Sequence, residues 1–580
     1  MTPRTLQEPG ALAPTAFSPL WPVLSVLAVA AILAGVLFSR IFPFVPQTGM
    51  APPVKFTDVT LRSGLTFLHD NGARPDQETP STLAGAVAFL DYDGDGRPDL
   101  FFVCGTRWPW IPPGPGARPS CALFHNDGDG TFTDVTEKAG LDVSMLGMGV
   151  AIGDYANEGR PDIFVTGVGG NRLFHNDGNG RFTDVTDSAG VRGSGNVWST
   201  GAVWLDIYGD GRLDLVVCNY ARWAPGTDLQ SAFLNEEAGP SYTMPAGFVS
   251  ALPTVYRNLG GGKFADVTGK TGLAVLDRDT GYPRAHPLAV AAVDANGDGR
   301  MDLLFTYQTG EDVLFLNRGD GTFRRWTPPR HERQEGASTE LVAAGGFLQP
   351  GSIRANDRFG LLRAAGLAMA PAPDVAEPFC NLREKLGVVL LDYDLDGRMD
   401  VISGNGLAEP DLDHFEHGRA FDSTPTLLWN DGERWVPATA APRGEALSRP
   451  AVARGIAVAD VFGDGYLDVV IAQNGGPPRL LRNDRRFEHV RHAWLRIDLV
   501  GTHCQRDAGG ARVEVHTPRG VLVQTMEPAM GYMAQSEGTL TFGLGDDNRI
   551  GRVVVRWPDG ILQEVRPPGV NRRLVITEPQ

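Results

Sequence analysis

Two patterns of apolar and polar positions alternate along the chain. The first is an apolar run, a loop of Asp and Gly and a second apolar run, as in LDYDGDGRPDLFF from Leu90 to Phe102. The second is an apolar run, an Asn-Asp-Gly turn and a shorter run, as in LFHNDGDGTFTDVT from Leu123 to Thr136. Short apolar runs bounded by Gly, Asn and Asp predict β-strands joined by tight turns. Each pattern therefore predicts a β-hairpin.

The two hairpins recur as a pair, which predicts a repeated four-stranded antiparallel unit. The first pattern starts at residues 90, 153, 205, 293, 391 and 459, and the second at 123, 173, 255, 314, 427 and 480. One unit cannot bury both faces alone, whereas a ring of units can. A seventh unit is expected between Trp326 and Leu386, where IRANDRFGLLRAAGL (353–367) resembles the second pattern. The fold class predicted for residues 54–490 is an all-β, seven-bladed β-propeller.

Both ends of the propeller region carry further signals. An extra KFTDVT at Lys55–Thr60 predicts that a strand from the N-terminal side closes the ring. The pattern does not determine which strand of the last blade it replaces. After residue 490 the repeats give way to short alternating strands, such as HAWLRIDLVGT (492–502) and GRVVVRWPDGILQEV (551–565). Residues 491–580 are therefore expected to form a separate β-sandwich-like domain.

One segment is apolar enough to cross a membrane. Leu20–Phe38 contains no charged residue, and at about 1.5 Å of helical rise per residue it roughly spans the hydrocarbon core. We interpret it as one transmembrane anchor after a tail at 1–19 and before a linker at 39–53; a long signal peptide is the alternative. Under the anchor interpretation the protein is single-pass in the cell membrane, with its bulk extracytoplasmic.

The Asp-rich loops have the composition of a site for a hard cation. We number them acidic loops 1 to 6 in chain order and their residues 1 to 9, so that acidic loop 1 is Asp91–Asp99. Carboxylates at positions 1, 3, 5 and 9 and a free carbonyl at position 7 supply oxygen ligands, and glycine at position 6 permits the turn. Flexible, oxygen-rich coordination favours Ca²⁺ over Mg²⁺.

Three loops are complete, so about three strong calcium sites are expected. Their candidate ligands are Asp91, Asp93, Asp95, Arg97 (carbonyl) and Asp99 in loop 1; Asp294, Asn296, Asp298, Arg300 (carbonyl) and Asp302 in loop 4; and Asp392, Asp394, Asp396, Arg398 (carbonyl) and Asp400 in loop 5.

The other three loops lack an oxygen ligand at position 3, where Ala156, Tyr208 and Phe462 stand instead. Their weaker candidates are Asp154, Glu158 and Asp162 in loop 2; Asp206, Asp210 and Asp214 in loop 3; and Asp460, Asp464 and Asp468 in loop 6. The alternative for these loops is a polar turn held by bonds from Asp to the backbone.

Charge and chemistry narrow the function classes. The net charge of −17 argues against a nucleic-acid partner, which requires clustered Lys and Arg. Five cysteines do not make a disulfide scaffold, although Cys104 and Cys121 could staple one loop or simply fill the core. His414 and His417 favour a surface loop over a transition-metal site, and His125 and His175 share one repeat position, which favours a structural role. The sequence contains no recognisable catalytic constellation, so we expect no enzyme.

A partner surface is expected on the face opposite the acidic loops. Connections alternate between the two faces of a propeller, and three of those on the opposite face are long: Gly105–Ser120, Asn219–Pro253 and Gly404–Pro425. Aromatic and Arg side chains dominate binding hot spots. The candidate residues are Arg107, Trp108, Trp110, Tyr220, Arg222 and Trp223. The alternative is that the aromatic side chains fold back over the propeller's own channel.

The repeats resemble the FG-GAP/VCBS repeats of calcium-loop propellers. The last segment resembles the ASPIC/UnbV domain through WLRIDLVGT, RDAGGARVEV, GYMAQSEGTLTFGLGD and VVVRWPDG. Together the two parts resemble the bacterial relatives of cartilage acidic protein. The resemblance implies an extracytoplasmic location, calcium binding and interaction rather than catalysis.

Three functions fit these observations. The first is a membrane-anchored, calcium-binding protein-interaction module. The second is a glycan-binding or lyase-like carbohydrate-active protein on the same scaffold. The third is an accessory subunit of a membrane complex.

Overall fold

The computed structural model describes most of the region after residue 53. The described residues are 54–72, 80–103, 105, 121–223, 234–235, 239–240, 248–274, 276, 286–307, 313–326, 387–404, 424–432, 435–438, 446–487, 492–527 and 533–580. They all belong to one compact unit, Ala51–Gln580. The expected membrane segment at Leu20–Phe38 and the expected seventh unit lie outside the described residues. Within the described residues, no helix has the length and apolar character needed to span a membrane.

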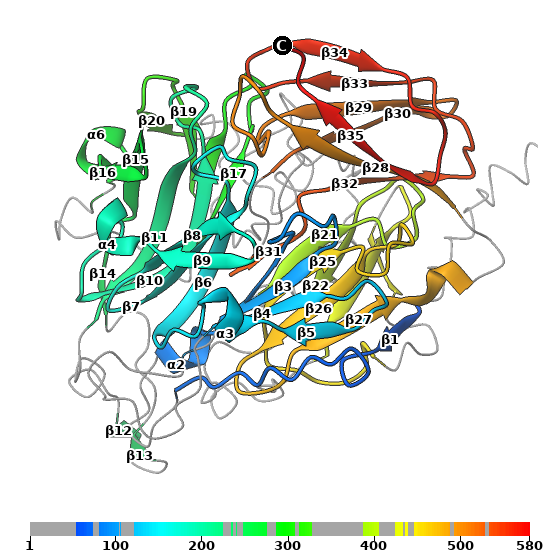
Figure 1. Cartoon of the computed structure of the whole chain (residues 1–580). Coiled ribbons are helices and arrows are strands. Elements are labelled where there is room, and N and C mark those ends of the chain that lie inside the picture. The colour runs from blue at the N-terminus through cyan, green and yellow to red at the C-terminus, as the bar shows by residue number, and fades with distance from the viewer. Residues whose placement is uncertain are drawn as a thin grey trace, which may run out of the picture. The chain divides into compact units, whose positions relative to one another are not determined.

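Six four-stranded antiparallel units follow one another along the chain, and we refer to them as blades 1 to 6 (Figure 1). Backbone pairing joins blades 2 and 3 into one nine-stranded sheet, and a strand from the C-terminal region adds a fifth strand to blade 1. Each unit matches one predicted pair of hairpins. The first three are blade 1, with β2 (Ala86–Leu90), β3 (Asp99–Val103), β4 (Cys121–Asn126) and β5 (Phe132–Asp134); blade 2, with β6 (Leu146–Gly153), β7 (Asp162–Val168), β8 (Arg172–Gly178) and β9 (Arg181–Asp184); and blade 3, with β10 (Val197–Leu205), β11 (Asp214–Arg222), β15 (Thr254–Gly260) and β16 (Lys263–Asp266).

The remaining blades follow the same order. They are blade 4, with β17 (Pro287–Val293), β18 (Asp302–Tyr307), β19 (Val313–Asn317) and β20 (Phe323–Arg325); blade 5, with β21 (Val388–Leu391), β22 (Asp400–Ser403), β23 (Thr426–Asn430) and β24 (Trp435–Pro437); and blade 6, with β25 (Ala453–Ala459), β26 (Asp468–Gln473), β27 (Arg479–Asn483) and β1 (Phe56–Asp58). Short extra strands β12 (Leu234–Asn235), β13 (Gly239–Pro240) and β14 (Val249–Ser250) lie between β11 and β15.

Blade 6 is completed by a strand from the N-terminal side. Strand β1 pairs antiparallel with β27, so that Phe56 lies opposite Asn483. The prediction of a closing strand is confirmed, and the closing strand occupies the outer edge of the blade. The four strands of this blade therefore come from two distant parts of the chain.

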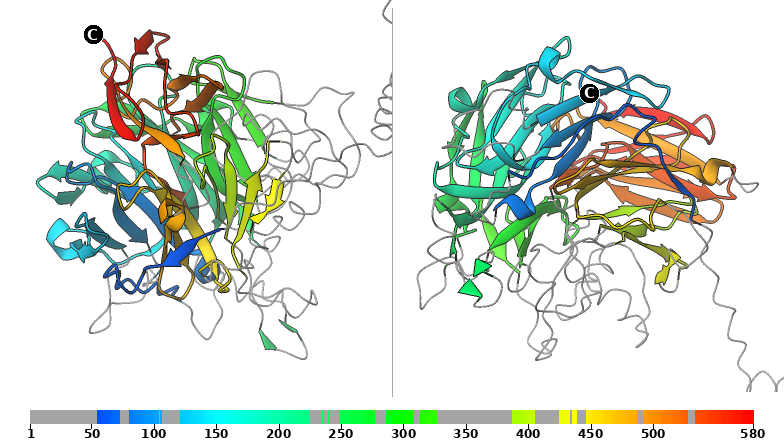
Figure 2. Two further views of the ribbon diagram at one scale, coloured as in Figure 1. Left: turned by 90° about the vertical axis from the view of Figure 1, so that its right-hand side faces the viewer. Right: turned by 90° about the horizontal axis from the view of Figure 1, so that it is seen from below.

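The first strand of each blade is buried on both faces, which explains its continuous apolar sequence. Every residue of β2, β6, β17, β21 and β25 is buried. These strands contact their counterparts in neighbouring blades, as between β2 and β6, β6 and β10, β10 and β17, β21 and β25, and β25 and β2. The described sheets are thus arranged side by side around their first strands, in a propeller-like manner (Figure 2).

Short helices follow the outer strand in several blades. They are α3 (Thr136–Ala139), α4 (Thr186–Ala189) and α6 (Thr268–Thr271), with α2 (Pro80–Leu83) before β2 and a 3₁₀ turn η5 (Asp484–Phe487) after β27. The Asp-Val-Thr sequence starts such a turn because Asp134 Oδ1 accepts the N–H of Thr136 at 2.9 Å. Gly140 ends it with φ of 79°, a left-handed conformation that glycine adopts without strain.

The C-terminal region folds into two sheets, as expected for a sandwich. One contains β32 (Leu540–Gly545), β28 (Ala493–Val500) and β35 (Arg572–Thr577), and the other β30 (Gly520–Thr525), β29 (Arg512–Thr517), β33 (Arg552–Arg556) and β34 (Leu562–Val565). Alternate residues of the strands point inward, and Val513, Val515, Val553 and Val555 are fully buried in their common core. The other side of the strands is mainly polar, with exposed apolar residues such as Leu562 and Val575.

One strand of the C-terminal region leaves this sandwich and joins the blades. Strand β31 (Ala534–Gln535) pairs in parallel with β2, the first strand of blade 1. It also contacts β6 and β25, the first strands of the two adjacent blades. Gln535 exchanges two hydrogen bonds with the backbone of Ile152, at 2.7 and 3.0 Å. The C-terminal region is therefore fastened among the inner strands of the blades.

Candidate metal centres on the acidic loops

All six acidic loops share one backbone scaffold. The position 1 carboxylate accepts N–H groups from within its own loop, as Asp91 does from Gly96 at 2.9 Å. The position 9 carboxylate is buried, and in five loops it accepts two further N–H groups, as Asp99 does from Tyr92 at 3.1 Å and from Asn126 at 2.7 Å. In loop 2, Asp162 accepts the N–H of Asn176 at 2.8 Å, and its Oδ2 has no hydrogen-bond partner among the described residues. Position 6 is glycine with positive φ in every loop. These bonds set the turn, and in acidic loops 1, 4 and 5 the position 5 carboxylate also pairs with the arginine at position 7.

Acidic loop 1 gathers four carboxylates and a histidine. Oxygen atoms of Asp91, Asp93 and Asp95 lie within 4.8 Å of one another, and Asp93 and Asp99 form a second such group with His125. Burial raises the pKa of Asp99 to about 8, and the charges of Asp93 and Asp95 add to the rise. The carboxylates repel one another, so a bound cation would stabilise the loop.

Acidic loop 5 is the most enclosed of the complete loops. Asp392, Asp394 and Asp400 are all buried, and oxygen atoms of the three lie within 4.8 Å of one another. Burial raises the pKa of Asp392 and of Asp400 well above the usual range, and their neighbouring carboxylates raise it further. Asp394 Oδ1 is buried without a hydrogen-bond partner among the described residues. A buried, unpaired oxygen in an anionic cluster fits a calcium ligand.

Acidic loop 4 has the same scaffold with more exposed ligands. Asp294 accepts the N–H groups of Gly297, Asp298 and Gly299 at 2.8 to 3.1 Å. Burial raises the pKa of Asp302 to about 7, and the charges of Asp298 and Asp294 contribute. Glu527 from the C-terminal region adds another carboxylate: burial, followed by the charge of Asp294, raises its pKa well above the usual range. The sequence reasoning missed Glu527 because it lies far from the repeat.

In acidic loops 3 and 6 the side chain at position 3 packs instead of offering an oxygen. Tyr208 lies against Gly321, in a turn of the next blade, and under the guanidinium of Arg257 at 3.9 Å from the ring centre. Phe462 lies against Gly130, in the corresponding turn of blade 1. Each ring fills space that a side chain on those glycines would occupy. The aromatic substitutions therefore replace a ligand with contact between blades.

Acidic loop 6 already contains a cation supplied by the protein. Arg496 Nη1 lies 2.9 Å from Asp460 Oδ2, and its Nη2 lies 2.5 Å from Glu537 Oε1. Arg496 is 4% exposed. Burial raises the pKa of Asp460 to about 6, a rise that Arg496 opposes. The guanidinium neutralises the loop from the C-terminal side, which removes the electrostatic need for calcium there.

Acidic loop 2 is also met by side chains from the C-terminal region. Asp507 Oδ2 accepts the N–H of Asp154 at 2.9 Å, and Arg506 lies beside Gly159. His175 Nδ1 lies 2.9 Å from Asp162 Oδ1, and this bond raises the pKa of His175. Glu158, expected as a ligand, pairs with Arg160. This bond agrees with the structural role expected for His175, whereas in loop 1 His125 Nδ1 lies 3.4 Å from Asp93 and from Asp99 and has no hydrogen-bond partner among the described residues.

The C-terminal region contacts every acidic loop. The contacts are Arg573 with Gly96 in loop 1, Asp507 with Asp154 in loop 2, His503 beside Gly211 in loop 3, Gly510 beside Met301 in loop 4, His492 with Asp394 in loop 5, and Arg496 with Asp460 in loop 6. Each acidic loop is thus touched by the C-terminal region, although Asp93, Asp95, Asn296 and Asp298 remain exposed. These contacts have no local signal in the repeats, because they come from a part of the chain that does not contain the repeat pattern.

A recurring asparagine ties neighbouring blades together and was not singled out from the sequence. Asn176 Nδ2 donates to the carbonyl of Tyr92 in acidic loop 1 at 2.9 Å. The same bond runs from Asn126 to Val461, from Asn258 to Tyr155, from Asn317 to Ile207 and from Asn483 to Tyr393. The signal was available, because this asparagine begins the turn in every copy of the second pattern.

Arginine at position 7 has a side-chain role beside the carbonyl role expected for it. Arg97 Nε donates to the carbonyl of Asn126 at 2.7 Å, and Arg300 and Arg398 donate to the carbonyls of Asn317 and Asn430. These bonds join the acidic loop to the Asn-Asp-Gly turn of the same blade. The two kinds of loop therefore lie on one side of the blades, as expected from the strand order.

The expected partner surface is wrong at two of its residues. Tyr220 and Trp223 are 1% and 2% exposed and belong to the core around Trp198 and Phe248. They pack inward because β11 continues into the apolar region beside the first strands of blades 1 and 2. Arg222 is exposed. Arg107, Trp108 and Trp110, together with Cys104, His414 and His417, lie outside the described residues.

Two family descriptions match the chain. The model described as "FG-GAP-like repeat" matches residues 91–165, 154–217, 294–345 and 392–471, and the model described as "ASPIC and UnbV" matches residues 501–580. The repeat matches begin at position 1 of acidic loops 1, 2, 4 and 5. The C-terminal match contains most of the sandwich.

Known proteins are similar to parts of this chain. Cartilage acidic protein 1 of Xenopus tropicalis is 24% identical over 331 residues, covering 57% of this chain and 39% of the relative. The Homo sapiens protein of that name is 25% identical over 393 residues, covering 65% of this chain and 53% of the relative. A solved structure of BBS1N in complex with ARL6DN is 10% identical, with a TM-score of 0.34 over 75% of this chain and 98% of that one. The chain thus matches about half the length of the two cartilage acidic proteins or less. It is a protein of FG-GAP-like repeats with a C-terminal ASPIC and UnbV domain, related to cartilage acidic protein 1.

Proposed function

We propose that this protein is a calcium-binding, extracytoplasmic interaction module, anchored in the cell membrane by Leu20–Phe38. Its blades form a seven-bladed propeller whose seventh blade comes from residues 327–386. Calcium binds acidic loops 1, 4 and 5, and the ASPIC and UnbV domain is held over them. The protein works by presenting surfaces to a protein partner, with the membrane segment placing it beside membrane complexes.

The single observation that carries calcium binding is the buried cluster of acidic loop 5. Asp392, Asp394 and Asp400 bring three carboxylates together without a basic side chain among them, and one oxygen has no partner among the described residues. Ionised carboxylates at this spacing and burial are strongly unfavourable unless a cation neutralises them. Calcium supplies that charge and accepts several oxygen ligands at once.

The cover over the acidic loops supports a structural rather than a catalytic role for the metal. The contacts from Arg573 to Gly96 and from His492 to Asp394 place the ASPIC and UnbV domain directly on loops 1 and 5. A metal enclosed between two domains stabilises both of them and their contact. Interaction with a partner then falls to the surfaces that the docked domain leaves open.

Calcium-dependent unfolding tests the metal part of the proposal. A ligand that binds only the folded state stabilises it by roughly 2.7 kcal/mol at a hundredfold excess over its dissociation constant. We expect the melting temperature to rise with calcium and to fall with EDTA, and Asp93→Ala to reduce the response more than Glu158→Ala. Identical melting in calcium and EDTA, with no metal retained on purification, rejects the calcium role.

Location and partner class need separate measurements. Protease added to intact spheroplasts should remove the propeller, and full protection until the inner membrane is lysed contradicts the topology. A pull-down with the detergent-solubilised native protein should recover a specific protein. A glycan array that gives specific binding, together with an empty pull-down, favours the carbohydrate-binding alternative instead.

A further inference from the structure

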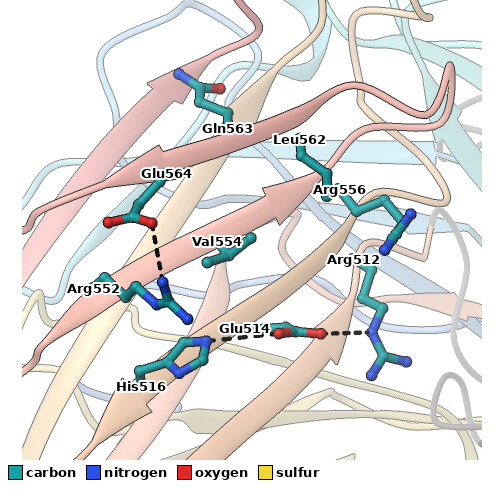
Figure 3. Close-up of a pocket in the computed structure, with 9 residues that line it drawn as sticks. All are labelled: Arg512, Glu514, His516, Arg552, Val554, Arg556, Leu562, Gln563 and Glu564. Carbon is teal, nitrogen blue, oxygen red and sulfur yellow. Dashed lines mark hydrogen bonds and ion pairs between the residues drawn. The ribbon is translucent and has the colours of Figure 1, made fainter.

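The outer face of the four-stranded sheet in the C-terminal domain contains an open groove of about 350 Å³ (Figure 3). Residues of alternating register line it: Arg512, Glu514 and His516 from β29, Arg552, Val554 and Arg556 from β33, and Leu562 and Glu564 from β34. The valines of opposite register on β29 and β33 point into the core. This face therefore points away from the sandwich interior.

Two arginines in the groove lie directly opposite each other. Arg512 and Arg556 are register partners on β29 and β33. Like charges in that position destabilise a sheet by a few tenths of a kcal/mol to about 1 kcal/mol. Arg512 is partly compensated by Glu514 at 3.4 Å, whereas no carboxylate in the described part of the chain pairs with Arg556. A ligand that brings negative charge would offset the repulsion between the two guanidinium groups.

The remaining groove residues are largely paired with one another. Arg552 pairs with Glu564 at 3.1 Å, and His516 Nε2 lies 3.6 Å from Glu514 Oε2. Gln563 bonds to Trp557 and to the carbonyl of Thr577. Arg556 thus has no ion pair in the described part of the chain, and Arg512 keeps N–H groups that Glu514 does not use; the two side chains lie side by side in Figure 3. Guanidinium groups match the planar, two-oxygen geometry of a carboxylate.

Apolar surface adjoins the arginine pair. Leu562, the register partner of Arg556, is 59% exposed, and Val554 lies between the charged side chains. An apolar side chain next to a carboxylate satisfies both parts of the groove, whereas a sulfated sugar has no such side chain. The net charge of −17 means that an acidic ligand is repelled by much of the remaining surface. Binding is thus directed to this groove.

We propose that this groove binds an acidic peptide segment of a protein partner, in which carboxylates alternate with apolar side chains. Arg512 and Arg556 hold a carboxylate, and Leu562 and Val554 contact the neighbouring apolar side chain. The inference rests on the proposed interaction function and gives it a partner chemistry. It assigns the contact to the ASPIC and UnbV domain rather than to the blades.

Fluorescence anisotropy with the full-length, detergent-solubilised chain tests the groove. The probe is a labelled, end-blocked Leu-Glu-Leu-Glu-Leu peptide, with Leu-Gln-Leu-Gln-Leu as its neutral counterpart. We expect only the acidic peptide to bind, Arg556→Gln to weaken binding about tenfold, and Arg556→Lys to restore it only in part, because lysine keeps the charge and loses the fork. Arg549→Gln removes an exposed arginine outside the groove and should leave affinity unchanged.

Several outcomes overturn the inference. Equal losses in Arg556→Gln and Arg549→Gln indicate general charge attraction. Binding of a heparin-derived octasaccharide, dependent on Arg556, without peptide binding assigns the groove to a sulfated polymer. No binding of either probe rejects the site. Melting of the same samples in calcium and EDTA reports the calcium proposal separately, so failure of one is not mistaken for failure of the other.

Discussion

The guanidinium of Arg496, in the ASPIC and UnbV domain, lies 2.9 Å from the carboxylate of Asp460, the first residue of acidic loop 6. An arginine from one domain thus occupies the acidic loop of another. The same side chain reaches Glu537, just after the strand that joins blade 1. One buried cation therefore connects a loop, a sandwich strand and the inserted segment.

Removing that cation should destabilise the protein strongly. Arg496→Met leaves Asp460 and Glu537 buried without a counter-charge, which typically costs about 3–5 kcal/mol. Urea unfolding should show this loss, and the exposed control Arg549→Gln should not. Near-normal stability of Arg496→Met indicates that the ion pair is dispensable. If calcium partly restores the free energy of unfolding of this variant, calcium has taken the place of the guanidinium in acidic loop 6.

Asp394→Asn should act in opposite directions with and without calcium. In EDTA the substitution removes one of three clustered buried carboxylates, so the variant should be more stable than the parent. In calcium it loses a ligand, and most of the roughly 2.7 kcal/mol gained at hundredfold excess should disappear. Melting in the two buffers measures both effects. The control is Asp464→Asn in acidic loop 6, whose Asp460 already pairs with Arg496. This substitution should leave the calcium response intact.

The hydrogen bond between blades 1 and 2 should contribute to stability, and Asn176→Ala tests this contribution. The substitution leaves the buried carbonyl of Tyr92 without the amide that it accepts at 2.9 Å. An unsatisfied buried polar group costs roughly 1–3 kcal/mol. Chemical denaturation should show that loss, while Asn196→Ala, at an exposed position, should stay within about 0.5 kcal/mol of the parent. Equal effects at the two positions contradict the proposed role of the amide.

His69 should make the fold sensitive to acid. Burial, with a smaller contribution from Arg454, lowers the pKa of His69 to about 3, and its Nδ1 accepts the N–H of Gly475 at 3.0 Å. Between pH 6.5 and 3 the unfolded chain binds a proton that the folded chain does not. The contribution of neutral His69 to the free energy of unfolding is therefore fully present above pH 6.5. It is lost as the pH falls from 6.5 towards 3, by about 1.4 kcal/mol per pH unit.

Urea unfolding between pH 6.5 and 4.5 measures this dependence. His69→Asn keeps an acceptor near the Nδ1 position and cannot gain a proton in this range. Its unfolding free energy should fall less steeply with acid than that of the parent. Parallel slopes for the two proteins assign the acid sensitivity to other groups.

The repeat could be predicted because its cause is local. Alternating hairpins are encoded by apolar runs and by Gly, Asn and Asp at turns, and the six described blades have the expected strands. The shared loop scaffold follows for the same reason. Glycine at position 6 and carboxylates at positions 1 and 9 fix the turn through bonds within the loop or to the adjacent hairpin. A pattern within one repeat contains that information.

The cover over the loops could not be predicted because it depends on distant residues. Arg496, Asp507 and Glu527 reach loops 6, 2 and 4 from a domain whose sequence has no repeat. Likewise, Tyr220 and Trp223 looked like exposed hot-spot residues, yet they are buried. Composition identifies an aromatic side chain but does not say whether the next element covers it.

The position of β31 sets the order in which this chain can reach its final structure. Residues 534 and 535 occupy a place beside β2, whose own residues are made hundreds of positions earlier, and β1 waits for β27 over a similar separation. During synthesis the inner edge of β2 therefore stays unpaired until residues 534 and 535 exist, and β1 stays unpaired until β27 exists. Pairings of such long range close slowly, and open strand edges invite aggregation. A chain truncated before residue 533 would keep that inner edge open permanently, so residues more than 400 positions further along the chain govern the survival of the first blade.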